Sequence, residues 1–273
     1  AATPVSNTSI TYDTTAPTIS SVTPASSSTV GSGFSANYTL SETVGSGTIT
    51  FTRTGGSVDG ATHIYNFGNG DKTSGSHSIT RATLESGFGN SLVNGAVYTM
   101  TVSATDVALN AATPVSNTSI TYDTTAPTIS SVTPASSSTV GSGFSANYTL
   151  SEAVASGTIT FTRTGGSADG ATHIYNFGNG DKTSGSHSIT RASLESGFGN
   201  SLVNGAVYTM TVSATDVALN AATPVSNTSI TYDTTAPTIS SVTPASSSTV
   251  GSGFSANYTL SEAVASGTIT FTR

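Results

Sequence analysis

The sequence repeats itself with a period of 110 residues, and this repetition limits what the chain can fold into. Residues 1–110 and 111–220 align without a gap and differ at only four positions, while residues 221–273 are identical to 111–163. The four differences are Thr43/Ala153, Gly45/Ala155, Val58/Ala168 and Thr83/Ser193. A period of this length is too long for one turn of a solenoid and matches the size of an independently folding domain. The sequence therefore predicts a row of equivalent domains.

The boundaries between these domains are indicated by the segment Asp13–Pro17 and its copies starting at Asp123 and Asp233. These segments are predicted linkers, because proline fixes its own φ and pushes the preceding residue into extended geometry. The predicted organisation is the last strand of a preceding copy at 1–12, complete repeats at 13–122 and 123–232, and the N-terminal part of a third repeat at 233–273. Because the chain starts at Ala1 with a fragment of a repeat, we expect it to be a window on a longer array.

Composition excludes several classes of function. The net charge is −7 with seven Lys and Arg, which excludes electrostatic binding to nucleic acid or to an anionic membrane. The absence of cysteine excludes a disulfide scaffold and a thiolate metal site. No apolar run approaches the roughly 20 residues of a membrane span. Each repeat holds one Lys and two His, and His63 and His77 are expected at the surface or on edge strands. We therefore expect no enzymatic activity.

Apolar residues recur with a period of two, which is typical of half-buried β-strands. The clearest case is the stretch from Tyr98 to Ala104, in which apolar residues alternate with Thr and Ser. The predicted strands of one repeat contain 18–22, 34–40, 48–52, 62–67, 76–83, 98–104 and 115–122. With Gly- and Ser-rich turns between them, they predict an all-β fold in which each repeat is a β-sandwich of about seven strands. No stretch predicts a long helix, and a hairpin turn is expected at 68–71.

Two motifs resemble known families. Leu92-x-x-Gly95-x-x-Tyr98 resembles the tyrosine corner of immunoglobulin and fibronectin-III sandwiches. The stretch from Tyr98 to Asn110, followed by Asp123-Thr-Thr-Ala-Pro127, resembles the bacterial Ig-like repeats of giant secreted adhesins, although that family usually has Gly where Leu109 stands. The resemblance implies tandem Ig-like domains arranged end to end, located extracellularly at the cell surface. It also implies a spacer that is often stiffened by calcium.

The acidic residues supply the candidate metal ligands. In a seven-strand sandwich, the BC, DE and FG loops share one pole with the N-terminal linker, and oxygen ligands clustered there would suit Ca²⁺. Asp59 and Glu85 are expected at the opposite pole, facing the next repeat. The candidate ligands at the two junctions are Asp13, Glu42, Asp71, Asp106 and Asn110, and then Asp123, Glu152, Asp181, Asp216 and Asn220. Two alternatives stay open, namely bridges from Arg53 and Arg81 to the acids of the next repeat, and simple solvated loops.

The sequence thus favours a structural spacer or stalk in a bacterial extracellular adhesin or surface filament, because near-identical copies add length without adding distinct sites. Its expected partners are neighbouring repeats of the same chain, and lateral association of shafts into a fibre is left open. The alternative function is a multivalent glycan- or ice-binding module that uses an outward row of threonines. This row would contain Thr48, Thr50, Thr52 and Thr54. Repetition would then raise avidity without any new type of contact.

The strand lengths predict the extension of the array. Strands of eight to ten residues give a sandwich near 30 Å long, so each repeat with its linker should add roughly 40–50 Å along the axis. Small-angle scattering from proteins with increasing numbers of repeats measures this increment. Side-by-side packing of consecutive repeats would give a much smaller increment and would contradict the end-to-end arrangement.

Overall fold

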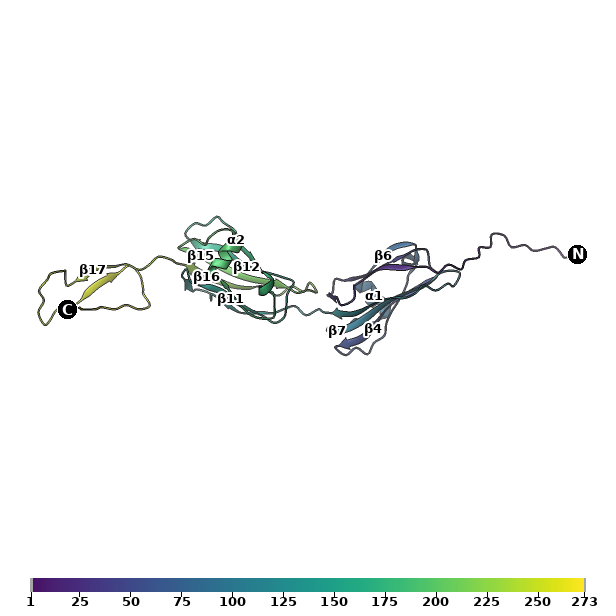
Figure 1. Cartoon of the computed structure of the whole chain (residues 1–273), viewed down its shortest axis with the longest axis horizontal. Helices are drawn as coiled ribbons and strands as arrows, with labels where there is room; N and C mark the ends of the chain where they lie inside the picture. Colours follow the sequence, from purple (N-terminus) through teal and green to yellow (C-terminus); the bar gives the residue numbers. More distant parts are fainter. Residues whose placement is uncertain (1, 273) are drawn as a thin grey trace.

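The computed structural model describes residues 2–272 and contains two β-sandwiches placed end to end (Figure 1). Their hydrophobic cores have no residue in common, since one is built between Ile19 and Tyr122 and the other between Ile129 and Tyr232. The segment 2–18 has no regular secondary structure, and 234–272 forms only the strands β17 (Ile239–Thr243) and β18 (Asn257–Leu260). The prediction of tandem all-β sandwich domains is confirmed.

The two complete repeats have the same elements in the same order. The first contains β1 (Ile19–Thr23), β2 (Thr29–Val30), β3 (Ser35–Leu40), β4 (Ser46–Gly56), β5 (His63–Asn66), the 3₁₀ turn η1 (Asn69–Lys72), β6 (Gly75–Thr80), α1 (Arg81–Phe88), β7 (Ala96–Thr105) and β8 (Val115–Tyr122). The second contains β9 (Ile129–Thr133), β10 (Thr139–Val140), β11 (Ser145–Leu150), β12 (Ser156–Gly166), β13 (His173–Asn176), η2 (Asn179–Asp181), β14 (Gly185–Thr190), α2 (Arg191–Phe198), β15 (Ala206–Thr215) and β16 (Val225–Tyr232).

Each sandwich packs a three-stranded sheet against a five-stranded one. In the first repeat the strand orders are β1-β3-β6 and β2-β8-β7-β4-β5, and all neighbours are antiparallel except β2 and β8. Side chains alternate along β7 between the buried interior and the outer face, as the period of two predicts. Tyr98, Met100 and Val102 of β7 enter the core with Ile49 and Phe51 of β4. The core between the two sheets is therefore made of the apolar residues that the sequence alternation predicts to face inward.

Hydroxyl side chains cover the outer face of the five-stranded sheet. The threonines of β4 alternate with buried Ile49 and Phe51 and face away from the core, and Thr101 on the adjacent strand β7 contacts Ser116 of β8 through its hydroxyl. β-branched Thr is the residue expected on such a half-solvated pleated surface, whatever the surface does. The rows of threonine therefore need no binding role to explain them.

The predicted strand 76–83 ends early, at Thr80, and a short helix follows it. The Thr80 hydroxyl accepts a hydrogen bond from the Thr83 backbone N–H and caps the start of α1, while Gly89 in the left-handed region ends it. Leu84 and Phe88 lie one turn apart, and Leu84 is fully buried in the core. None of the helices among the described residues is long and apolar enough to cross a membrane.

The tyrosine corner is present, and it contains a buried polar group that the sequence did not reveal. The backbone N–H of Val93 donates to the Tyr98 phenol oxygen at 2.9 Å, as the motif predicts, and the phenol in turn donates to the carboxylate of Asp59. His63 Nε2 lies 2.6 Å from the same carboxylate, and both side chains are almost fully buried. Burial by itself raises the pKa of Asp59, but the hydrogen bonds from Tyr98, His63 and the Ala61 backbone outweigh it and lower the pKa.

Two expectations from the sequence are therefore wrong. Asp59 does not face the next repeat, because its carboxylate holds the tyrosine corner together. Glu85 does not face it either, because it pairs with Arg81 and accepts a hydrogen bond from the Leu92 backbone. His63 lies on the edge strand β5, as one form of its prediction has it, but its side chain is buried against the tyrosine corner.

Replacing Asp59 should destabilise the first repeat and change its response to acid. Asp59→Asn leaves buried partners poorly satisfied, so we expect a loss of about 2–4 kcal/mol in the free energy of unfolding at pH 7. The lowered pKa means that the carboxylate stabilises the fold above its unfolded pKa of about 3.9, and that this contribution is lost as the pH falls through the folded pKa. The variant should lack that acid-sensitive contribution. Urea unfolding at several pH values measures both effects.

The neighbouring substitution Val58→Ala is the control for this experiment. Val58 is 85% exposed, and the second repeat has Ala168 at the same position, so the cost should stay below about 1 kcal/mol. An Asp59→Asn variant as stable as Val58→Ala would show that the buried hydrogen bonds carry no stability.

Candidate functional site

Three acidic side chains gather at the N-terminal pole of each sandwich. Asp13, Glu42 and Asp106 form one group and Asp123, Glu152 and Asp216 form the other. Within each group, one carboxylate oxygen from every residue lies within 4.8 Å of the others. The buried member of each group is Asp106 or Asp216, which lies in the FG loop, that is, between β7 and β8 or between β15 and β16. The structure therefore brings these three predicted acids together, and it also places the predicted asparagine, Asn110 or Asn220, in hydrogen-bond contact with the aspartate of its group.

The fold places these groups through the ends of its strands. Asp123 follows β8 directly and lies in the linker, so it belongs to the connection between two repeats. Glu152 lies in the turn after β11 and Asp216 follows the end of β15. These two strands end at the pole where the linker enters the second sandwich. The equivalent residues of the first repeat, Asp13, Glu42 and Asp106, form the same arrangement. The acidic group thus joins one linker residue to two loop residues of the following repeat.

The FG loop that carries the buried aspartate is closed by its own hydrogen bonds. Asp216 and Asn220 bond through their backbones at 3.1 Å, and the Asp216 carboxylate accepts both the backbone N–H and the side-chain amide of Asn220. Between them Leu219 adopts a left-handed conformation with φ of 69°. A glycine is the residue that tolerates this conformation best.

Two asparagine side chains hold the linker, one from each repeat. Asn94 of the first repeat accepts a hydrogen bond from the Thr124 backbone and donates one to the Thr125 hydroxyl, both at 2.7 Å. Asn220 of the second repeat donates to the backbone carbonyl of Asp123 at 3.0 Å. Asn220 and its counterpart Asn110, both predicted as metal ligands, lie against the acidic groups, where their amide nitrogens donate to the aspartate and to the linker carbonyl.

Asp71 and Asp181 were also predicted as ligands, and the structure separates them from the acidic groups. The Asp71 carboxylate accepts hydrogen bonds from the Tyr65 phenol at 2.6 Å and from the Gly68 backbone at 2.8 Å, which closes η1. Asp181 makes the same contacts with Tyr175 and Gly178. The stretch expected as a hairpin is thus a 3₁₀ turn between strands of different sheets.

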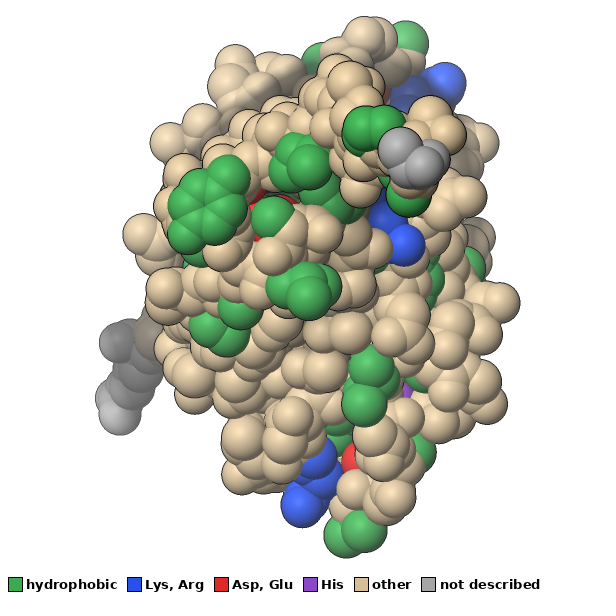
Figure 2. All heavy atoms as spheres, turned by 90° about the vertical axis from the view of Figure 1, so that its right-hand side faces the viewer, with side chains coloured by type: hydrophobic (Ala, Val, Ile, Leu, Met, Phe, Trp, Pro, Cys, Tyr) green, Lys and Arg blue, Asp and Glu red, His purple; other side chains and the backbone are tan. Residues whose placement is uncertain are grey.

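The charges of each acidic group are not compensated by nearby arginines. Arg53 donates to the backbone carbonyls of Ser57 and Gly56, and Arg81 pairs with Glu85 of its own repeat. The predicted alternative of arginine bridges to the next repeat is therefore wrong. Seen along the long axis, the surface is mostly neutral with only scattered charged side chains (Figure 2).

The pKa values of the acids reflect this environment. Burial raises the pKa of Glu152, and repulsion from Asp123 and Asp216 raises it further. For Asp106, burial acts to raise the pKa, but hydrogen bonds from the Asn110 side chain and from the loop backbone outweigh it and lower the pKa. The loop around Asp106 thus favours its charged carboxylate, while the acidic neighbours of Glu152 favour its neutral form. A bound cation would reverse the second effect.

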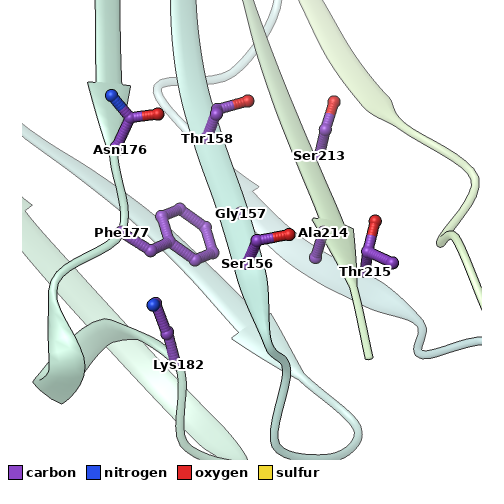
Figure 3. Close-up of a pocket in the computed structure, with 9 residues that line it drawn as sticks. All are labelled: Ser156, Gly157, Thr158, Asn176, Phe177, Lys182, Ser213, Ala214 and Thr215. Carbon is purple, nitrogen blue, oxygen red and sulfur yellow. The ribbon is translucent and has the colours of Figure 1, made fainter. Parts of the chain in front are cut away.

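A separate hollow lies on the second sandwich between β12, β13 and β15 (Figure 3). Hydroxyls from Ser156, Thr158, Ser213 and Thr215, the amide of Asn176 and the ammonium of Lys182 surround the edge of Phe177. Phe177 can lie there because Gly157 has no side chain, since a Cβ at Gly157 would come within 2.3 Å of the ring. The hollow contains no carboxylate, so it is not a second version of the acidic groups.

Comparison with known proteins adds little beyond the fold. No family model and no curated protein matches the sequence. Among solved structures, the fibronectin(III)-like modules of Clostridium thermocellum CbhA align with a TM-score of 0.39 and 14% identity, covering 80% of this chain and 94% of that one. A chimeric titin Z1Z2-Z1Z2 tandem aligns with a TM-score of 0.20 and 15% identity, covering 80% of this chain and 99% of the tandem. The fold assignment therefore rests on the strand order, the two sheets and the tyrosine corner.

Removing one charge from an acidic group should stabilise the fold when no divalent cation is present. The raised pKa of Glu152 means that its ionised form opposes folding at neutral pH, and that this penalty disappears as the pH falls below the folded pKa. Glu152→Gln in EDTA should therefore raise the melting temperature of the second repeat slightly, by an amount corresponding to under about 1 kcal/mol. Thermal melts in EDTA at pH 7 measure it. A lower melting temperature would show that the carboxylates do not repel each other.

Proposed function

We propose that this chain is a structural spacer in a bacterial extracellular adhesin or surface filament, and that Ca²⁺ binds at its repeat junctions and stiffens them. The observation that carries the proposal is the acidic group of Asp123, Glu152 and Asp216, in which the linker itself supplies one carboxylate. A cation held there would connect the linker to the sandwich that follows it. The same group occurs at Asp13, so the device is repeated with the sequence.

Calcium is the cation that fits these residues best. It prefers carboxylate, carbonyl and water oxygens in a flexible shell of six to eight ligands. Each group offers three carboxylates, and the linker adds carbonyl oxygens close by, since the Asp123 carbonyl lies next to the FG loop. There is no cysteine in the chain and no histidine in either group, so softer metals have no preferred ligand. Extracellular modules bind Ca²⁺ at about 10⁻⁴–10⁻³ M, so the site would fill outside a cell.

The spacer role is supported by the repetition and by the neutral shaft. Two repeats that differ at four positions expose nearly the same surface twice. The ion pairs Arg81–Glu85 and Arg191–Glu195 neutralise charge within each sandwich. The resemblance to adhesin repeats points to the same role. The alternative of multivalent glycan or ice binding rests on the outward threonines and on the shallow hollow of Figure 3. We rank it second because β-propensity alone accounts for the threonines.

Calcium should stabilise the second repeat and stiffen the junction before it. At a concentration 100 times the dissociation constant, a site absent from the unfolded chain adds about 2.7 kcal/mol. We expect a higher melting temperature in Ca²⁺ than in EDTA, and a scattering curve that changes from a flexible to a rigid two-sandwich rod. Asp123→Ala should remove the part of both changes that comes from the second acidic group.

Asp233→Ala is the matched control. Asp233 has the same sequence context as Asp123, but among the described residues it belongs to no acidic group. This variant should respond to Ca²⁺ as the parent does. The proposal fails if Ca²⁺ changes neither stability nor shape, or if both variants respond equally to it.

A further inference from the structure

The two sandwiches meet at a glycine of the first repeat. Gly31 lies between β2 and β3, and the tip of the Asp216–Asn220 loop of the second repeat rests against it. A Cβ added at Gly31 would lie only 2.1 Å from the Ala218 carbonyl oxygen and 3.2 Å from its carbonyl carbon. Real Cβ atoms do not come that close to backbone oxygen, so the neighbouring repeat leaves room for glycine alone.

Comparing the two copies of each residue shows that the neighbouring repeat is what buries Gly31 and Ala218. Ala218 at the loop tip is 6% exposed, whereas its counterpart Ala108, which has no sandwich in front of it, is exposed. Gly31 is buried, and its counterpart Gly141 is exposed. A Cβ at Gly141 would meet only the Asp233 backbone at 3.5 Å, an ordinary contact. The same residues are thus free at one position of the array and packed at the other.

The backbone of Gly31 does not itself require glycine. Its φ lies outside the left-handed region, so alanine would fit the local conformation. The Cβ direction at Gly31 is occupied by a hydrogen that points at the Ala218 carbonyl oxygen, which is the arrangement of a weak Cα–H···O contact. Such a contact allows two backbones to approach more closely than any side chain would permit.

We propose that Gly31 is the socket for the FG loop of the next repeat, and that this loop transmits cation binding to the angle between the sandwiches. Asp216 lies two residues before Ala218 in a loop closed by Asp216 and Asn220, so a cation that fixes Asp216 also fixes the tip. The coupling to the cation rests on the proposed function, whereas the socket itself does not. The partner of this surface is another repeat of the same sequence.

Pulsed electron paramagnetic resonance between two spin labels tests both parts. The chain has no cysteine, so Thr52→Cys and Thr162→Cys, both at exposed positions, give one label in each sandwich. The distance distribution is measured with Ca²⁺ and with EDTA in this labelled parent, in Gly31→Ala and in Gly141→Ala. Alanine at Gly31 must displace the loop tip by roughly 1 Å to reach a normal contact, and the long sandwiches convert this into a shift of the labels. Circular dichroism and melting temperature check that each variant is folded.

We expect Gly31→Ala to shift or broaden the distribution in both solutions, while Gly141→Ala matches the parent. We also expect Ca²⁺ to narrow the parent distribution more than that of Gly31→Ala. A Gly31→Ala distribution identical to that of the parent in EDTA and in Ca²⁺ overturns the socket. Equal narrowing of both proteins by Ca²⁺ overturns the coupling while leaving the proposed function intact. Absence of narrowing in the parent overturns the proposed function and the coupling together, and the socket is then judged from the EDTA data alone.

Discussion

The structure depends on a short linker that is hydrogen-bonded from both sides. The Asp123 backbone N–H donates to Val30 of the first sandwich at 2.9 Å, and its carbonyl accepts from Asn220 of the second. Asn94 fixes the two threonines that follow. Because these bonds leave the linker little freedom, the Asp123 side chain reaches the acidic group in a defined position. The position of the second sandwich relative to the first is thus set by hydrogen bonds to the linker. Under the proposed function, the carboxylates add negative charge that a bound cation would neutralise.

A chain of identical units requires each repeat to match its own copy. The C-terminal pole of one sandwich must fit the N-terminal pole of the next, so one sequence must encode both halves of the contact. Gly31 and the Ala218 loop meet this requirement with backbone atoms, which do not depend on a side chain of either partner. The acidic group meets it differently, because its linker member is covalently shared by both repeats. Charge elsewhere is satisfied within the sandwich, as the buried contacts of Asp59 show.

Much of the fold could be predicted from the sequence, because strand alternation and repetition are local signals. The alternation from Tyr98 to Ala104 places the same residues inside that the structure buries. Topology then predicted that Asp13, Glu42 and Asp106 share a pole, and the structure brings them together.

What could not be predicted depends on contacts between distant segments. Asp59 lies in a Gly-rich stretch that looks like a solvated turn, and its burial follows only from the position of the Tyr98 phenol. From the sequence, Asp71 looked like the other acidic loop residues, but its carboxylate accepts a hydrogen bond from the nearby Tyr65 phenol. The signal that was available for Asp59 is the Tyr98 phenol of the tyrosine corner. Its oxygen accepts a backbone N–H, and its own proton still needs an acceptor when the ring is buried. For α1, the signals were a threonine cap, Leu84 and Phe88 one turn apart, and a glycine after them.

Counting bound calcium ions by isothermal titration calorimetry of the intact chain tests the central claim most directly. The account requires an ion for each complete acidic group, that is, one at Asp13, Glu42 and Asp106 and one at Asp123, Glu152 and Asp216. Asp233 belongs to no acidic group among the described residues and should add none. The predicted result is therefore two ions per chain at sub-millimolar to millimolar affinity, about 10⁻⁴–10⁻³ M. No heat of binding, or a stoichiometry unchanged by Asp123→Ala, would contradict a cation site built on the linker.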